Sequence, residues 1–214
     1  MAKPIQISVL IATYNTTFPL IKRAIKSVLA QSFSYFEIII IDDGSDNDSH
    51  NRLFGFCRKH EDKIVYLRQK NAGQSEAINR GVQLSKGDFI AILDADDEYR
   101  PQHLEYCMAN MSKYDLIAST TTTIINTPSD LWVPDRNIPS QLIHVDNCIL
   151  FATLFGRKEV FDSLKFKKGY GSDAVFYEAA KKKFKVGKLN LKTYVYYRNH
   201  KNSTCDQMKR TISQ

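Results

Sequence analysis

The sequence of 214 residues predicts an α/β fold, in which a central, mostly parallel sheet is flanked by helices. Two observations predict this class. The strand-like segments ISVLIAT and FEIIIID are apolar nearly throughout, which indicates strands buried on both faces. Segments with apolar residues at helical spacing alternate with such strands, as the crossover connections of a parallel sheet require.

The first half of the chain carries the regular part of this pattern. The predicted strands span residues 7–13, 36–42, 63–69 and 88–94, and the predicted helices span 18–31, 46–60 and 75–84. In sheets of this kind, ligands bind beyond the carboxyl ends of the strands. The polar residues that follow these strands are therefore the first candidates for a binding site.

The second half is less regular, and we expect it to form an irregular C-terminal part of the fold. Helices are predicted over 101–111 and 172–183, and β-structure over 114–125 and 188–198. Residues 126–147 hold three prolines and the only tryptophan, Trp132, and are expected to form a long loop or lid. Chain length favours one domain over residues 1–214.

Composition narrows the partners and the compartment. The chain has 30 basic and 23 acidic residues, with the excess late in the sequence, and no aromatic RNA-binding motif, so we expect no nucleic acid. No apolar run reaches the ~18 residues of a membrane span, and no signal peptide is recognised. Four scattered cysteines fit a reducing cytoplasm. The basic runs are either a solvated surface or a contact with the inner face of a membrane.

The segment IAILDADDEYR sets four carboxylates behind an apolar strand. Asp94 and Asp96 are two residues apart, so at the end of an extended strand both can face one point. Oxygen ligands at this spacing suit Mg²⁺ or Mn²⁺, which bind partly through substrate phosphates. Spacing alone supports an acidic turn equally well. We expect Glu98 to begin the next turn.

A second acidic pair, Asp42 and Asp43, closes IIIIDDGSD. This pair is either turn chemistry, with Gly44 at positive φ, or a carboxylate that accepts hydrogen bonds from a base or sugar. The chain has no glycine-rich phosphate loop. A diphosphate would therefore need a cation, which the acidic cluster could hold.

Five segments together resemble family 2 glycosyltransferases with the GT-A fold. They are SVLIATYN, IIIIDDGSDND, NAGQSEAINRGVQLSKGDFIAILDADD, GYGSDAVFYEAAKKKFKVG and YYRNHKNSTC, which cover nearly the whole chain. The resemblance implies transfer of a sugar, with inversion, from a nucleotide diphosphate donor, usually UDP-linked, to an acceptor hydroxyl. It also implies that residues 1–98 bind the donor and that residues 99–214 bind the acceptor.

The resemblance also implies roles for single residues, grouped here by ligand. Nucleotide contacts are expected from Thr13, Tyr14, Asn15, Asp43, Asn71, Gly73, Arg80 and Asp94. The divalent cation, Mn²⁺ or Mg²⁺, is expected at Asp96 and His200, and the donor sugar or diphosphate at Asp97, Arg198 and Lys201. Trp132 is a weaker candidate for the acceptor, because an aromatic face suits a sugar ring.

The general base is expected at Asp173. The family uses the Asp of a Glu-Asp pair that opens a helix, and here the pair reads Ser172-Asp173, so the Ser puts acceptor recognition in doubt. The sequence has no QxxRW, the signature of processive synthases, which favours single addition to a saccharide, lipid-linked or protein acceptor. A homodimer is left open. The alternatives are a catalytically inactive sugar-binding relative and a DxD-type phosphatase.

Overall fold

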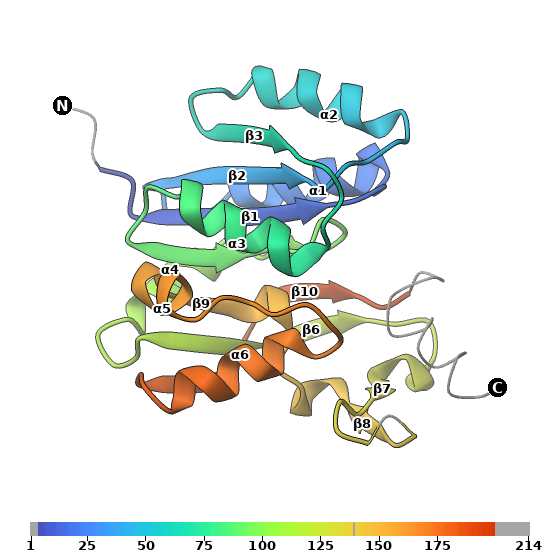
Figure 1. Cartoon of the computed structure of the whole chain (residues 1–214), viewed down its shortest axis with the longest axis vertical. Coiled ribbons are helices and arrows are strands. Elements are labelled where there is room, and N and C mark those ends of the chain that lie inside the picture. The colour runs from blue at the N-terminus through green and yellow to red at the C-terminus, as the bar shows by residue number, and fades with distance from the viewer. Residues whose placement is uncertain (1–3, 139, 200–214) are drawn as a thin grey trace.

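The computed structural model describes residues 4–138 and 140–199. Among them an eight-stranded sheet has the order β3-β2-β1-β4-β9-β6-β10-β5, and β7 pairs with β8 separately (Figure 1). The strands are β1 (Ile7–Thr13), β2 (Phe36–Asp42), β3 (Ile64–Arg68), β4 (Phe89–Ile92), β5 (Glu98–Tyr99), β6 (Leu116–Ile124), β7 (Trp132–Pro134), β8 (Leu142–His144), β9 (Leu154–Arg157) and β10 (Val186–Tyr197). The α-helices are α1 (Phe18–Leu29), α2 (Ser49–Arg58), α3 (Gln74–Leu84), α4 (His103–Ala109), α5 (Lys158–Ser163) and α6 (Ser172–Lys181). Three short 3₁₀ helices are η1 (Pro128–Leu131), η2 (Val145–Asn147) and η3 (Phe151–Thr153).

The first half forms four parallel strands, with β1 between β2 and β4 and with β3 outside β2. Every residue of β2 is buried, because α1 and α3 cover opposite faces of this part of the sheet (Figure 1). Helix α3 lies close to the sheet at Gly81, where an added Cβ would be 2.8 Å from Ile41 Cδ1. The apolar strands are thus explained by burial on both faces.

The second half continues the same sheet through an antiparallel strand. β9 is antiparallel to both β4 and β6, so β4 and β6 run in the same direction. β10 is parallel to β6, and the two-residue β5 is antiparallel to β10 at the edge. The carboxyl ends of β6 and β10 therefore lie at the same edge of the sheet as those of β1, β2 and β4.

The predicted class, a mostly parallel sheet flanked by helices, is confirmed, and the first two strands have the predicted bounds. Sequence reasoning missed β5, β9 and α5, which are too short to show a period. The expected loop over residues 126–147 contains η1, the β7–β8 hairpin and η2. Glu98 was expected to begin a turn and lies instead in β5.

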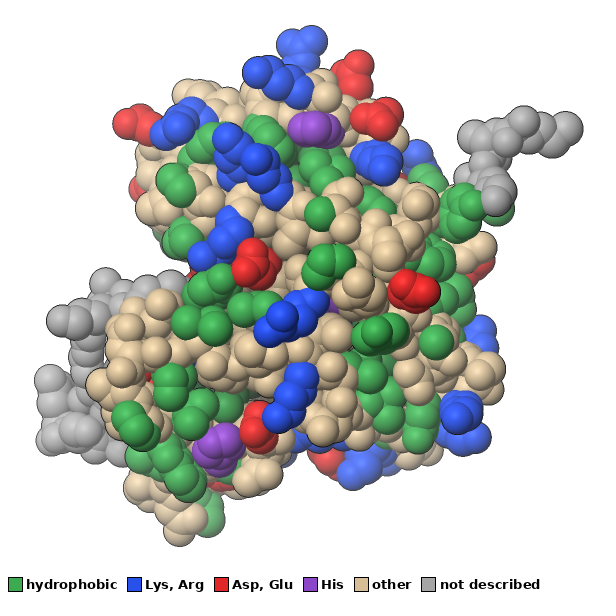
Figure 2. Space-filling model, turned by 180° about the vertical axis from the view of Figure 1, so that it is seen from behind, with side chains coloured by type: hydrophobic (Ala, Val, Ile, Leu, Met, Phe, Trp, Pro, Cys, Tyr) green, Lys and Arg blue, Asp and Glu red, His purple; other side chains and the backbone are tan. Residues whose placement is uncertain are grey.

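The surface shows how the charge of the chain is distributed. On the face seen in Figure 2, lysine and arginine side chains are separated by hydrophobic and polar surface, so the net charge of +7 is spread out there. The same view shows hydrophobic side chains over the β7–β8 hairpin, where Trp132 and Leu142 are exposed. Within residues 4–138 and 140–199, no helix is both long and apolar enough to cross a membrane.

Helix α4 carries a buried histidine against the edge of the sheet. His103 is 2% exposed, its Nδ1 is 2.7 Å from Thr193 Oγ1, and its ring stacks on Tyr99 with centroids 3.9 Å apart. Burial lowers the pKa of His103 to about 3. The folded protein therefore keeps this ring neutral at a pH where the unfolded chain would protonate it.

This difference predicts a loss of stability in acid. Because the folded pKa lies below the unfolded value of about 6.5, the unfolded state binds more protons as the pH falls below that value. When the pH falls from about 7.5 to about 5, protonation of His103 in the unfolded chain should lower the free energy of unfolding by about 2 kcal/mol. Urea unfolding at both values should show a smaller loss for His103→Gln. Equal losses in the wild type and in His103→Gln would show that His103 does not cause the loss of stability in acid.

Candidate active site

The candidate site is built at the carboxyl ends of β1, β2 and β4. Thr13 pairs with Asp42 at the ends of β1 and β2, and the Asp43 backbone N–H donates to the Thr13 carbonyl at 2.8 Å. The Asp42 carboxylate is fully buried, where it accepts from the Ser45 N–H at 2.8 Å and from the Tyr66 hydroxyl at 2.7 Å. Asp42 is therefore a structural residue that shapes the turn after β2.

Asp43 supports the loop that leads into α3. Its carboxylate accepts from Gln69 Nε2 at 2.7 Å, from the Ala72 N–H at 2.9 Å and from the Gly73 N–H at 2.8 Å. Asp43 was expected to pair with the base of the nucleotide. Because a carboxylate accepts about four hydrogen bonds, these three leave room for one more.

The loop after β1 is held against the loop after β2. Asn15 has a positive φ of 53°, its N–H donates to Ser45 Oγ at 2.9 Å, and its Oδ1 accepts from the Asp46 N–H at 3.0 Å. These bonds leave Tyr14 exposed at the surface, with 53% of its area accessible. Across the opening, Asn71 and Gly73 are also exposed at the start of α3.

Asp94 and Asp96 follow β4 and are both partly exposed. Gln74, the first residue of α3, donates from Nε2 to Asp94 Oδ1 at 2.8 Å. Burial raises the pKa of Asp94 to about 7, and the Asp96 and Asp173 carboxylates add to this rise. Asp94 is thus close enough to Asp96 and Asp173 for their charges to disfavour its own, and a bound cation would relieve this repulsion.

Asp97 points into the protein instead of into the site. It is 1% exposed, and its carboxylate accepts from the Tyr194 hydroxyl at 2.5 Å and from the Tyr197 N–H at 2.8 Å. Burial raises the pKa of Asp97 well above its usual range, and Asp94 and Asp96 contribute to this. Asp97 was expected at the donor sugar or diphosphate, and in the structure both of its carboxylate oxygens accept hydrogen bonds from β10.

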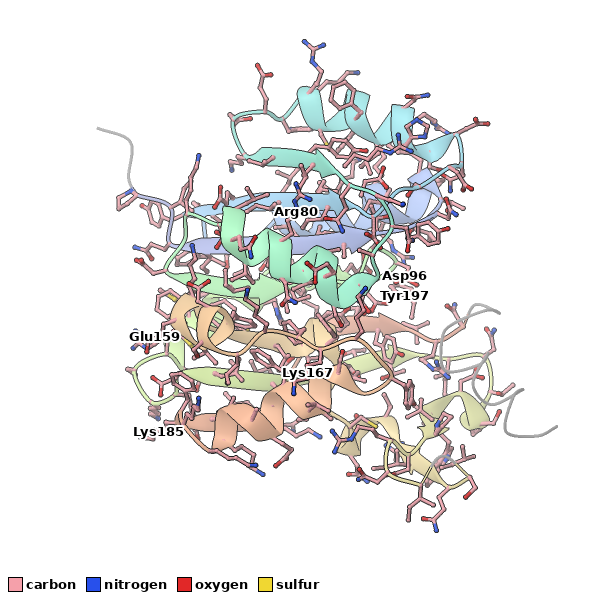
Figure 3. The ribbon with its side chains drawn as sticks, in the orientation of Figure 1. Arg80, Asp96, Glu159, Lys167, Lys185 and Tyr197 are labelled. Atoms are coloured by element: carbon pink, nitrogen blue, oxygen red, sulfur yellow. The ribbon has the colours of Figure 1, made fainter. Side chains whose placement is uncertain are left out.

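Arginine 23 was not predicted, although it holds the same segment from the other side. Its Nη2 donates to the Asp96 backbone carbonyl, and its guanidinium lies 3.7 Å from the ring centroid of Tyr197. The Tyr197 hydroxyl donates to Glu98 Oε1 at 2.6 Å. Figure 3 shows Asp96 and Tyr197 together at this edge of the sheet. Helix α1 and strand β10 therefore clamp residues 96–98 between them.

Asp173 lies in the first turn of α6, after Gly171 with its positive φ of 71°. Its Oδ1 accepts from the Ala174 N–H at 2.8 Å. Burial raises the pKa of Asp173, while hydrogen bonds from backbone N–H groups and the charge of Arg136 oppose the rise. The neighbouring Ser172 Oγ is 3.3 Å from Ser75 Oγ of α3, which brings the start of α6 beside the start of α3.

A pocket of about 520 Å³ opens at Asp173. One side is formed by the β7–β8 hairpin and the other by the start of α6 and the segment before η3. Its lining includes Val133, Arg136, Ile143, Asn147, Tyr170 and Asp173. The hairpin is tied to the α6 side, because the Tyr170 hydroxyl donates to the Pro134 carbonyl at 2.8 Å.

Other predicted residues are not brought into this cluster. Arg80 is exposed further along α3, away from Asp96 (Figure 3). Arg198 is 3% exposed and donates from Nε to the Asp130 carbonyl at 3.1 Å. Trp132 lies on the hairpin, 44% exposed, against the ring of His144. The predicted His200 and Lys201 lie outside the described residues.

The carboxylates at this site suit a cation that is bound partly by the phosphates of a substrate. Within residues 4–138 and 140–199, no group of three His, Cys, Asp or Glu side chains is placed to hold a metal ion. Mg²⁺ and Mn²⁺ sites with substrate phosphates commonly use only one or two carboxylates. Asp94 and Asp96, whose charges repel, fit such a site.

The mostly parallel sheet flanked by helices is an α/β fold of the GT-A type. The chain belongs to glycosyl transferase family 2, whose family description matches residues 8–179. This confirms the resemblance seen in the sequence motifs. It also removes the support for the phosphatase alternative, which rested on the DxD pattern alone.

Two curated relatives cover only part of the chain. An uncharacterized glycosyltransferase of Nostoc sp. is 39% identical over 112 residues, which is 52% of this chain and 34% of the relative. The succinoglycan biosynthesis protein ExoW of Rhizobium meliloti is 32% identical over 112 residues, 51% of this chain and 35% of the relative. The matched region thus spans about a third of the length of these relatives.

Two solved structures share the fold. TarS 1–349 of S. aureus in complex with UDP-GlcNAc superposes with a TM-score of 0.71 at 18% identity, covering 97% of this chain and 65% of that one. The mannosyltransferase PcManGT of Pyrobaculum calidifontis, in complex with GDP-Man and Mn²⁺, also gives 0.71, at 15% identity and with coverage of 90% and 57%.

The clamp on residues 96–98 predicts a stability effect. Arg23→Gln removes a charged hydrogen bond and a cation–π contact and should lower the free energy of unfolding by about 2 kcal/mol in urea. Lys26→Gln, an exposed change on the same helix, is the control and should cost less than about 0.5 kcal/mol. Equal effects of the two changes would show that Arg23 does not stabilise residues 96–98.

Proposed function

We propose that this chain transfers a sugar, with inversion, from a nucleotide diphosphate sugar to an acceptor hydroxyl. The observation that carries the proposal is the approach of Asp94, after β4, to both Asp96 and Asp173 of α6, whose charges raise its pKa. Residues far apart in sequence would thus supply a cation site and a base at one opening. Membership of glycosyl transferase family 2 supports the same reaction.

The donor nucleotide is proposed to lie over the ends of β1 and β2. Tyr14 is exposed and offers an aromatic face to the base, and the Asp43 carboxylate has one acceptor position left. Exposed beside this opening are Asn15, Asn71 and Gly73, whereas Thr13, at the end of β1, is buried. UDP is the nucleotide that we propose, supported by the UDP-GlcNAc complex of TarS; PcManGT was solved with GDP-Man.

A divalent cation is proposed at Asp96, with Asp94 nearer the ribose. Such a cation neutralises the charge that grows on the diphosphate as the sugar leaves. PcManGT, which shares the fold, was solved with Mn²⁺. His200 and Lys201 remain proposals as a further ligand and a diphosphate contact. For Arg198 the structure gives weaker support, because the residue is buried.

Asp173 is proposed as the general base that accepts the proton of the attacking hydroxyl. Burial raises its pKa, which makes it a stronger base than an exposed carboxylate. The pocket beside it would hold the acceptor, and direct attack from this side inverts the anomeric carbon. Residues 1–98 would then serve the donor and residues 99–214 the acceptor.

The reaction is proposed to add one sugar at a time in glycan biosynthesis, the process named for the relative ExoW. Its proposed place is the cytoplasm, at the inner face of the membrane where the acceptor is lipid-linked. The free thiols of Cys57 and Cys107 support a reducing compartment.

Nucleotide binding should depend on the cation. UDP with Mn²⁺ at about 100 times its dissociation constant should raise the melting temperature by about 5–10 °C, and UDP alone by much less. Asp96→Ala should abolish the metal-dependent part, because it removes the proposed ligand. Differential scanning fluorimetry with UDP, GDP and Mn²⁺ measures this, and an undiminished shift in Asp96→Ala would remove the residue from the cation site.

Transfer should require the Asp173 carboxylate. Asp173→Asn keeps the shape of the side chain and should bind UDP with Mn²⁺ normally, while transfer falls by roughly 10²–10⁴-fold. Glu159→Gln, a change of the same kind at an exposed position of α5 outside the pocket lining, is the control and should keep most of the activity. The measurement is release of UDP from a panel of UDP-sugars with mixed acceptors. Wild-type protein that binds UDP but releases none would favour the inactive, sugar-binding alternative.

A further inference from the structure

We propose that the acceptor carries an oxyanion, a carboxylate or a phosphate, that is bound by Arg136. This inference rests on the proposed function, since it takes the pocket at Asp173 as the acceptor site. Arg136 and Asp173 both line that pocket of about 520 Å³. One small glycoside could therefore place its anion at Arg136 and its attacking hydroxyl at Asp173.

Arg136 is held in place by the backbone of the opposite wall. Its side chain lies over Gly171, where an added Cβ would be 2.3 Å from Arg136 Cδ and 2.5 Å from Cγ. Gly171 also has a positive φ of 71°, so glycine serves both the left-handed backbone and the close approach of the arginine stem. The guanidinium is thereby brought across from the hairpin to the start of α6.

The other charges in the pocket are already occupied. Asp135 Oδ1 accepts from the N–H groups of Asn137 and Ile138 at 2.7 and 2.9 Å. Glu178 also lines the pocket, and its carboxylate pairs with Lys181 at 3.3 Å. Both carboxylates therefore have partners on their own segments, and among the described residues neither forms an ion pair with Arg136.

Arg136 itself keeps most of its donors. Its Nη2 donates to Asn137 Oδ1 at 3.2 Å, and it takes part in none of the ion pairs found among the described residues. A guanidinium carries five N–H donors in a planar fork that matches a carboxylate or phosphate. An arginine that lines a pocket without a carboxylate partner is suited to bind an anion that comes from outside.

The remaining lining sets the size and kind of ligand. Val133, Ile143, Ile149 and Leu150 give apolar walls that suit the C–H faces of a sugar ring. Asn147 adds an amide for hydroxyl groups. The pocket therefore fits a saccharide with one negative charge better than a neutral or a highly charged ligand.

A different role for Arg136 must be separated from this one. Its charge lowers the pKa of Asp173, so Arg136 could act only by tuning the base. Tuning would affect neutral and anionic acceptors alike and would shift the pH profile of transfer. Binding of an acceptor anion would instead change the preference between the two kinds of acceptor.

The test compares methyl β-glucoside with its uronic acid and its 6-phosphate as ligands of the full chain, with and without UDP and Mn²⁺. Calorimetry should show at least one anionic probe binding about tenfold or more tightly than the glucoside, as expected for a charged hydrogen-bonded pair. Arg136→Gln should remove this preference, and Arg136→Lys should keep part of it. Lys182→Gln, an exposed change at the end of α6, removes the same charge outside the pocket and should keep the preference.

Equal binding of the neutral and both anionic probes to the wild type would overturn the proposal. A preference that survives Arg136→Gln, or a shifted pH profile without a change in preference, would overturn it as well. Tighter binding of the uronic acid or of the 6-phosphate identifies which anion the acceptor carries. Failure of UDP and Mn²⁺ to bind would count against the proposed function, whereas normal UDP binding without an anion preference would refute this inference alone.

Discussion

Repulsion among the carboxylates of residues 94–98 is the constraint on which the rest of the arrangement depends. Three of these acids accept hydrogen bonds from distant parts of the chain: Asp94 from the first residue of α3, and Asp97 and Glu98 from the end of β10. Arg23 of α1 holds the backbone between them. The hydrogen bonds that keep Asp97 and Glu98 in place therefore also connect the segment after β4 to β10 of the second half.

The regular half of the fold could be predicted because burial on both faces of the sheet produces a simple sequence pattern. Strands enclosed on both faces must be apolar at nearly every position, and β1 and β2 were located from that property alone. The second half gives weaker patterns. β9 has four residues and β5 two, and β10 is interrupted by a register shift between Leu189 and Tyr194, where Lys192 has a positive φ of 52°. Such strands are stabilised by neighbours that are distant in sequence.

The candidate site was likewise predictable only in part. The strand end marked Asp94 and Asp96 as candidates and the family resemblance added Asp173, and the fold brings Asp94 within electrostatic reach of the other two. Sequence could not show that Asp43 and Asp97 are largely occupied by the protein's own N–H and O–H groups. It also gave no signal for Arg23, whose partner is 73 residues away, since a basic residue on a helix is usually solvated.

Among the described residues, the β7–β8 hairpin forms no ladder with the main sheet. Its attachments include its two chain connections, the Tyr170 bond and the packing of Arg136 on Gly171. A segment joined in this way can change its length and side chains without disturbing the register of any central strand. Acceptor choice could then diverge quickly between relatives, or be transplanted between them, while the donor half stays under the constraints of a buried sheet.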